Sequence, residues 1–240
     1  MPTILALHYW AGAGHEYNSL LALLPPGTRL LAPDLPGYGQ QPVPPGFDFS
    51  VAAYANWVAA YATEQQLTDY YLIGHSMGGK VALALAAQQP AGLRGLLLLS
   101  PSPPTPEPIS PRDRADSLAA YGKPEEAKKT ARKITNRSLP EGSIDQIVAD
   151  NLRTNHGAWD AWLEQGSEED ISPLMLNVQL PCRLLVGSAD RAIPTEAQQH
   201  QTLPLLPPGT PFELVPDAGH LLPYEAPKEV AAALNALLAQ

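Results

Sequence analysis

One stretch of the sequence predicts the fold more strongly than any other: Tyr70-Tyr71-Leu72-Ile73-Gly74-His75-Ser76-Met77-Gly78-Gly79-Lys80. Its first four residues are apolar or aromatic and predict a short buried strand, and residues 81–89 predict a helix. Between them, Gly74 and Gly78 lie two residues on either side of Ser76. This spacing is typical of a strained strand-to-helix turn that exposes a serine hydroxyl above a sheet. Small neighbours make room for the turn, and the amides at the start of the helix can stabilise a developing negative charge.

The composition fits a globular protein and argues against several classes of partner. The chain has 240 residues, of which 45% are hydrophobic and 16% charged, so it can bury a substantial core. A formal net charge of −9 argues against nucleic acid or an anionic membrane, because both need a basic surface. Cys182 is the only cysteine, which excludes an intramolecular disulfide. With no recognisable signal peptide and only short apolar runs, we expect a cytoplasmic protein without membrane insertion.

Strands and helices alternate along the first hundred residues. Apolar runs predict further strands at residues 3–7, 29–32 and 93–100, and helices at about 16–24 and 50–66. Strands that are apolar on both faces predict a mostly parallel sheet covered by helices on both sides. In such sheets the functional loops lie at the carboxyl ends of the strands, where Ser76 and the first loop, residues 8–14, both fall.

The pattern changes at Pro101. Residues 101–111 contain six prolines, which rules out a helix or a central strand there. Helical stretches without a strand between them follow to about residue 176. Strands resume at residues 183–187 and 211–215, and a last helix is predicted at 227–238. We therefore expect a core domain formed by residues 1–100 and 181–240, with residues 101–180 inserted as a helical cap.

A serine nucleophile needs a neighbouring base and a group that orients this base. Of the six histidines, His220 directly follows the last predicted strand, and Asp190 follows the strand before it. Both should therefore lie at the same edge of the sheet as Ser76, in the chain order of the α/β-hydrolase triad. Asp34 and Asp217 are the competing carboxylates, and we expect both to satisfy loop amides instead.

Together these motifs resemble the α/β-hydrolase family, most of all its small capped serine carboxylesterases. The matching stretches are residues 8–12, 34–39, 74–79, 187–190 and 219–220, with Glu225 and Pro227 beyond. The resemblance covers nearly the whole chain outside the expected cap. It implies that Ser76 attacks a carbonyl, that His220 is the general base and then the general acid, and that Asp190 orients His220.

The resemblance also implies an oxyanion hole made by backbone N–H groups of Met77 and, in the first loop, Trp10. Two departures from the family pattern stand out. Tyr9 occupies the position after the first-loop histidine where the family usually carries glycine. The two strands that usually begin the family's sheet have no counterpart before Thr3, so we expect about six strands rather than eight.

The resemblance implies a small-molecule substrate. The aromatic rings of Tyr9 and Trp10 beside Ser76 should shorten the part of the pocket that holds the acyl group, which favours a short-chain ester. The candidate substrate-binding residues are Tyr9, Trp10, Trp159, Trp162 and Leu221. The two later tryptophans could equally pack the cap onto the core. No spacing of His, Asp or Glu predicts a metal site, we expect no cofactor, and the oligomeric state is not predicted.

These motifs specify the fold far better than the substrate. Ser76 argues against haloalkane dehalogenases and epoxide hydrolases of this fold, which use an aspartate nucleophile. Carbon–carbon bond hydrolysis, a lyase of the menaquinone-pathway type and cofactor-free perhydrolysis use the same triad and stay open. A hydrolase-like receptor that binds a ligand is the alternative outside the enzymes.

Overall fold

The computed structural model describes residues 2–240, whose six strands form one sheet with the order β2-β1-β3-β4-β5-β6. The strands are β1 (Thr3–Leu7), β2 (Arg29–Leu31), β3 (Tyr70–His75), β4 (Leu93–Leu99), β5 (Cys182–Gly187) and β6 (Phe212–Val215). Every neighbouring pair is parallel. The predicted sheet of about six strands is confirmed, and it is parallel throughout.

The register brings the carboxyl ends of the central strands together. Leu7 of β1 lies opposite Gly74 of β3, and Leu99 of β4 lies opposite both His75 and Leu185. Gly187 at the end of β5 pairs with the last residue of β6. The loops that follow β1, β3, β4, β5 and β6 therefore leave the sheet along one edge, as a parallel sheet requires.

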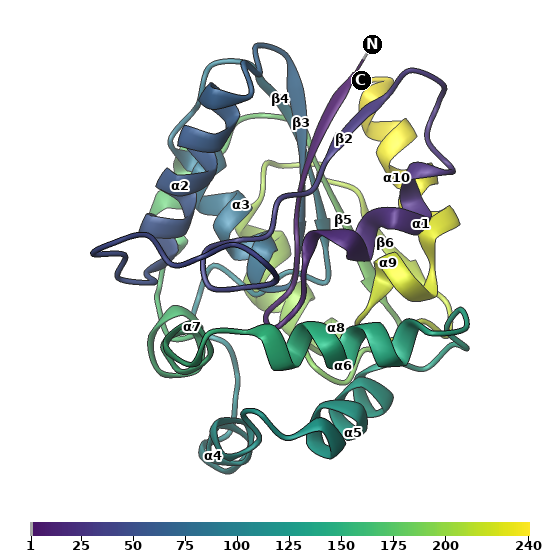
Figure 1. Ribbon diagram of the computed structural model, residues 1–240. Helices are drawn as coiled ribbons and strands as arrows, with labels where there is room; N and C mark the ends of the chain where they lie inside the picture. Colours follow the sequence, from purple (N-terminus) through teal and green to yellow (C-terminus); the bar gives the residue numbers. More distant parts are fainter. Residues whose placement is uncertain (1) are drawn as a thin grey trace.

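Helices cover both faces of the sheet (Figure 1). The larger apolar cluster includes α2 (Val51–Glu64) and α3 (Met77–Ala87), and the second includes α1 (Asn18–Leu21) and α10 (Pro227–Leu238). The strands supply both clusters by alternation. Leu5, Leu72 and Leu98 face the first, whereas Ile4, Ile73 and Leu97 face the second. Burial on both sides explains why the strand sequences are continuously apolar.

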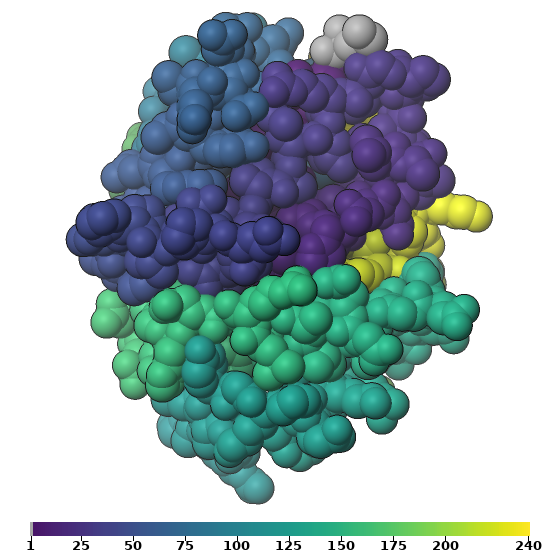
Figure 2. All heavy atoms as spheres, viewed as in Figure 1, coloured from purple at the N-terminus to yellow at the C-terminus, as the bar shows by residue number. Residues whose placement is uncertain are grey.

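The helices between β4 and β5 gather beyond the carboxyl edge of the sheet, at the lower end of Figure 1, except for the last of them, which packs beside the sheet. They are α4 (Pro111–Ala119), α5 (Pro124–Ile134), α6 (Ser143–Arg153), α7 (His156–Ala161), η2 (Trp162–Gly166) and η3 (Ser172–Asn177). In Figure 2 the teal and green atoms of this segment form a continuous layer over that end of the molecule. The last of these elements, η3, packs against α3 of the sheet layer.

The remaining short helices connect these layers. They are η1 (Gly14–Tyr17), α8 (Thr195–Ala197), η4 (Gln198–Thr202), η5 (Leu203–Leu205) and α9 (Leu222–Glu225). None of the helices formed by residues 2–240 has the length and apolar character needed to cross a bilayer.

Candidate active site

Ser76 occupies the strained turn that the sequence predicts. It follows β3 directly and precedes α3, with φ 53° and ψ −119°. A positive φ is uncommon for a residue with a Cβ and stores conformational strain. The flanking glycines are required by close contacts, because a Cβ on Gly74 would lie 2.6 Å from the Gly78 oxygen. A Cβ on Gly78 would lie 2.5 Å from the Leu7 oxygen.

Asp190 and His220 meet at the carboxyl ends of β5 and β6. Nδ1 of His220 lies 2.8 Å from Oδ2 of Asp190, and both residues are buried. The second carboxylate oxygen of Asp190 accepts hydrogen bonds from the backbone N–H groups of Ala192, at 2.8 Å, and Ile193, at 3.0 Å. With Nδ1 bound to the carboxylate, Nε2 is the nitrogen of His220 left to exchange a proton with a reactant.

The electrostatics of this pair favour the charged carboxylate. Burial by itself raises the pKa of Asp190, but the charge and hydrogen bond of His220 outweigh it and hold that pKa below its usual value. Burial likewise lowers the pKa of His220, and the Asp190 carboxylate outweighs it, so the net pKa of the imidazole is raised. The pair is therefore suited to accept a proton on Nε2 and stabilise the resulting imidazolium.

A cavity of about 470 Å³ opens onto Ser76 and His220. Its wall combines the first loop with α5 and with the η2 region. Among the predicted substrate-binding residues, Tyr9, Trp10 and Trp162 line it. The apolar part of the lining also includes Ala11, Ile109, Ala127, Ala131, Ile134, Ile147, Leu163 and Ile193. Two other surface hollows, of about 360 and 510 Å³, lie away from Ser76.

Trp159 and Leu221 lie one layer behind this wall. The Trp159 ring packs on Trp10 with centroids 4.2 Å apart, and its Nε1 donates to the Ser117 oxygen at 3.2 Å. Leu221 is fully buried and belongs to the same apolar cluster as Tyr9. Neither is among the residues that line the cavity, and each packs behind one of the aromatic side chains that do.

The two predicted oxyanion donors fall at suitable places in the chain. Met77 is the first residue of α3, where backbone N–H groups have no partner inside the helix. Trp10 lies in the first loop and lines the same cavity as Ser76. His8 holds this loop in place: its Nδ1 lies 2.7 Å from the Tyr9 oxygen, and its Nε2 accepts from the Leu35 N–H at 2.9 Å.

A second acid–imidazole pair lies beside the first. Nδ1 of His75 is 3.1 Å from both carboxylate oxygens of Glu16, and its Nε2 is 2.9 Å from the backbone oxygen of His220. Both side chains are fully buried. The chain thus fixes the backbone of His220 through a residue adjacent to Ser76. Because 59 residues separate Glu16 from His75, no local sequence pattern reveals this contact.

Glu225 ties the His220 loop to the end of α5. Its Oε2 accepts from the backbone N–H groups of Asn136 and Arg137, each at 2.8 Å, and of Gly219 at 2.9 Å. Its Oε1 accepts from the Leu221 N–H at 3.1 Å. The N–H of His220 itself donates to the Ile134 oxygen at 2.7 Å. The histidine loop is therefore bonded directly to the helix that forms one wall of the cavity.

Neither competing carboxylate bonds to His220, and only that of Asp34 satisfies loop amides as expected. Asp34 accepts from the backbone N–H groups of Gly14, at 2.8 Å, and Gln40, at 2.9 Å. Asp217 is exposed, and its own N–H donates to Ser188 Oγ at 2.9 Å. No group of three or more metal-ligating side chains occurs within residues 2–240.

A wholly parallel sheet that places a serine on a strained strand-to-helix turn defines the class of the α/β hydrolases. Comparison with protein families supports the same conclusion. The model of the Alpha/beta hydrolase family matches residues 4–233, and the chain belongs to this family.

Curated relatives cover four fifths of the chain or more. The 2-succinyl-6-hydroxy-2,4-cyclohexadiene-1-carboxylate synthase of Enterobacter is 29% identical over 254 residues, covering 99% of this chain and 92% of that protein. The pimeloyl-[acyl-carrier protein] methyl ester esterase of Neisseria meningitidis is 29% identical over 202 residues, covering 80% and 76%. Among solved structures, an esterase from Exiguobacterium antarcticum superposes with a TM-score of 0.88 at 16% identity, covering 100% of this chain and 92% of the esterase.

Proposed function

We propose that the protein is a serine hydrolase that cleaves carboxylic esters through an acyl-enzyme intermediate. The observation that supports this most directly is the Asp190–His220 pair, 2.8 Å apart, at the same cavity as Ser76 on its strained turn. A hydrogen-bonded acid and imidazole at the same cavity as a serine is the arrangement that activates a hydroxyl nucleophile. The reaction needs no cofactor.

In this proposal Ser76 Oγ attacks the ester carbonyl while Nε2 of His220 takes its proton. Asp190 stabilises the imidazolium, and the N–H groups of Met77 and Trp10 bind the tetrahedral oxyanion. Collapse of the intermediate expels the alcohol, which receives the proton from His220, and leaves Ser76 acylated. Water activated by His220 then releases the acid and restores the serine.

The segment of residues 101–180 acts as a cap over this site, and residues 1–100 and 181–240 form the core that carries it. Helices α5 and η2 of the segment contribute lining residues, so they enclose a small molecule rather than a polymer. We place the reaction in the cytoplasm, in line with the single cysteine of the chain.

The first test combines a panel of p-nitrophenyl esters with a fluorophosphonate label. Ser76→Ala should abolish both ester turnover and labelling, while the circular dichroism spectrum and thermal unfolding stay as in the wild type. Turnover by Ser76→Ala close to that of the wild type would contradict the nucleophile assignment.

We further propose a preference for short acyl groups, from acetyl to butyryl. Tyr9 is 7% exposed and lines the cavity, and its ring packs against Gly12 and His75. Each methylene buried in an open pocket gains about 0.8 kcal/mol, whereas overpacking costs roughly 1–3 kcal/mol. The ratio kcat/KM should fall beyond about six carbons, and Tyr9→Gly should move the optimum to longer chains. A profile in Tyr9→Gly that matches the wild type would assign chain-length control to the cap alone.

A lyase reaction of the menaquinone-pathway type is the second candidate, favoured by the Enterobacter relative that aligns with 99% of the chain. That relative is named for a carboxylate product, so this candidate requires a cavity that accepts anionic ligands. Carbon–carbon bond hydrolysis, perhydrolysis and ligand binding by a hydrolase-like receptor would use the same Ser76, Asp190 and His220. Labelling of Ser76 without turnover of any ester would favour these candidates over ester hydrolysis.

A further inference from the structure

One acidic side chain of the cavity stands apart from the other charges there. Glu107 lies between β4 and α4, is half-buried, and lines the cavity together with Ser76 and His220. Its backbone is fixed, because its N–H donates to the Ser167 oxygen at 2.8 Å and its oxygen accepts from Ile109 at 2.7 Å. Its carboxylate is therefore part of the cavity wall and not of a freely moving loop.

The other charged residues that line the cavity belong to its outer rim, apart from His220. They are three acids and three bases: Asp113, Asp116, Glu126, Lys129, Lys133 and Arg191. All are exposed except Glu126, which is half-buried. Equal numbers of opposite, solvent-screened charges leave little net field at the rim. Glu107 is thus the acidic side chain that the wall of the inner cavity itself contributes.

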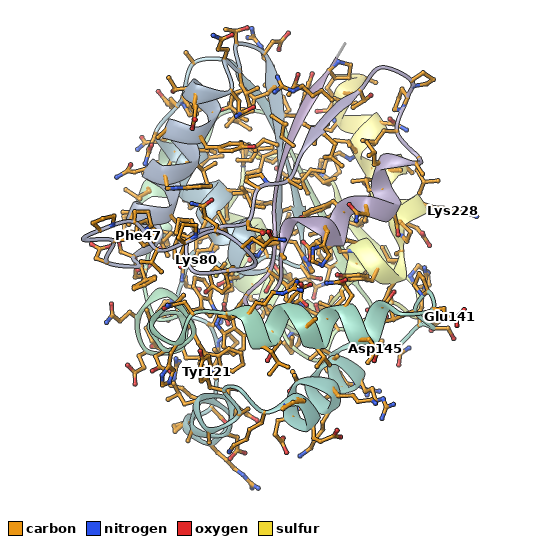
Figure 3. All side chains as sticks on the ribbon, in the orientation of Figure 1. Phe47, Lys80, Tyr121, Glu141, Asp145 and Lys228 are labelled. Carbon is orange, nitrogen blue, oxygen red and sulfur yellow. The ribbon has the colours of Figure 1, made fainter. Side chains whose placement is uncertain are left out.

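No basic side chain within residues 2–240 forms an ion pair with Glu107. The nearest buried cation, Lys80, is labelled in Figure 3 above α7. Lys80 directs its ammonium group to the backbone oxygens of Thr105, at 3.3 Å, and Ser167, at 3.5 Å. It attracts the Glu107 carboxylate from a distance but does not neutralise it by contact.

Glu107 also acts on the reacting centre. Burial raises the pKa of Glu107, and nearby Ser102, Lys80 and His220 oppose that rise. In return, the Glu107 carboxylate is among the charges that raise the pKa of His220. The carboxylate is therefore close enough for a charged group on a bound substrate to interact with it.

We infer that Glu107 determines the charge selectivity of the cavity: it disfavours esters with an anionic group near the reacting carbonyl and favours neutral or cationic ones. This inference rests on the proposed ester hydrolysis. Like charges a few ångström apart in a partly buried cavity should change kcat/KM on the order of 10- to 100-fold.

The experiment compares isosteric ester pairs at mildly alkaline pH. One pair is monomethyl glutarate and the methyl ester in which an isopropyl group replaces the carboxylate. The other is choline butyrate and its uncharged carbon analogue. The wild type should turn over the neutral glutarate analogue at least about 10-fold faster than the anion, and should prefer choline butyrate to its analogue.

Glu107→Gln keeps the size of the side chain and one carbonyl acceptor but removes its charge, so both preferences should fall towards unity. Glu126→Gln is the matched control on the rim and should keep them. Equal discrimination in the wild type and in Glu107→Gln, or none in the wild type, would overturn the inference and leave ester hydrolysis standing. Absence of Ser76-dependent turnover of every ester would instead overturn the proposed function. The comparison within the wild type stands even if Glu107→Gln fails to fold.

Discussion

The two carboxylate oxygens of Asp190 have different hydrogen-bond partners. One oxygen binds the imidazole of His220 at 2.8 Å, and the other accepts two backbone N–H groups of the following turn. The amides hold the carboxylate in place independently of His220. The orientation of the imidazole is therefore imposed by the loop after β5, and an isosteric residue without the charge should test that role.

Asp190→Asn should lower kcat about 10⁴-fold with the fold retained, because an amide can hold the imidazole in the wrong tautomer. Asp34→Asn and Asp217→Asn serve as controls. Asp34→Asn should mainly lower the free energy of unfolding, since that carboxylate accepts two loop amides, and Asp217→Asn should change little. Steady-state kinetics and urea denaturation separate these outcomes. Inactivation by Asp217→Asn and not by Asp190→Asn would show that the acid is misassigned.

The pH dependence of kcat/KM should report His220. The general base must be neutral, and the pKa of His220 is raised above its ordinary value of 6.5. Activity should therefore be lost as the pH falls through a midpoint above 6.5. Removing the Asp190 charge takes away the main opposing effect to burial, so the residual activity of Asp190→Asn should show a midpoint at lower pH. A midpoint that does not move would exclude His220 as the titrating base.

At the scale of elements, the β3–α3 unit depends on the absence of side chains at its glycines. A methyl group on Gly74 would lie 2.6 Å from the Gly78 oxygen, 2.7 Å from the Gly79 Cα and 2.8 Å from the Ala82 Cβ. Two of these atoms are backbone and cannot move away without shifting the helix against the strand.

Gly74→Ala should therefore destabilise the protein by about 1–3 kcal/mol and lower kcat, because the Ser76 turn moves with the helix. Gly157→Ala in α7 is a suitable control. A Cβ there would lie 3.2 Å from Asn155 Oδ1 and 3.5 Å from the Phe49 ring, contacts that side chains can relieve. Chemical denaturation of both variants measures the difference. Equal stability of the two variants would show that the elbow is less tightly packed than these distances require.

Local patterns explain why most of the elements could be predicted. Ser50, for example, is the N-cap of α2 as expected, and its side chain accepts a hydrogen bond from the Ala53 N–H at 3.0 Å. Contacts between distant segments could not be predicted in this way. The Glu16–His75 pair and the position of Trp159 behind Trp10 depend on how whole elements pack, and no periodicity encodes that. The positions of Asp190 and His220 could be predicted from the sequence, because parallel strands bring their carboxyl ends to a common edge.

At the scale of the whole molecule, Glu225 joins parts of the chain that the sequence separates. It accepts four backbone N–H groups, two from the segment after α5 and two that flank His220. The helical segment and the histidine loop are therefore held by one buried carboxylate. A backbone N–H that loses its acceptor in a buried place costs about 1–3 kcal/mol.

Glu225→Ala should thus destabilise the protein by several kcal/mol, at about 1–3 kcal/mol for each backbone N–H that loses its acceptor. The variant should also lower kcat more than it raises KM. The effect on kcat should be larger because the His220 loop loses its hydrogen bonds to Glu225, whereas most of the residues that line the cavity stay in place. Glu225→Gln keeps one carbonyl acceptor and should recover part of kcat. Glu229→Ala, which removes only a half-exposed ion pair with Arg137, should cost less than about 1 kcal/mol. A kcat of Glu225→Ala equal to that of Glu229→Ala would limit Glu225 to a structural role.

The strand order also determines when the candidate site can first exist during synthesis. Ser76 follows β3, but His220 follows β6 and is added to the growing chain 144 residues later. At about 5–20 residues per second, the ribosome needs roughly 7–30 s to cover that interval. Throughout this interval the nascent chain carries Ser76 without His220, its proposed base. In the proposed mechanism, hydrolysis therefore begins only after the C-terminal strand has paired, so an incomplete chain is inactive.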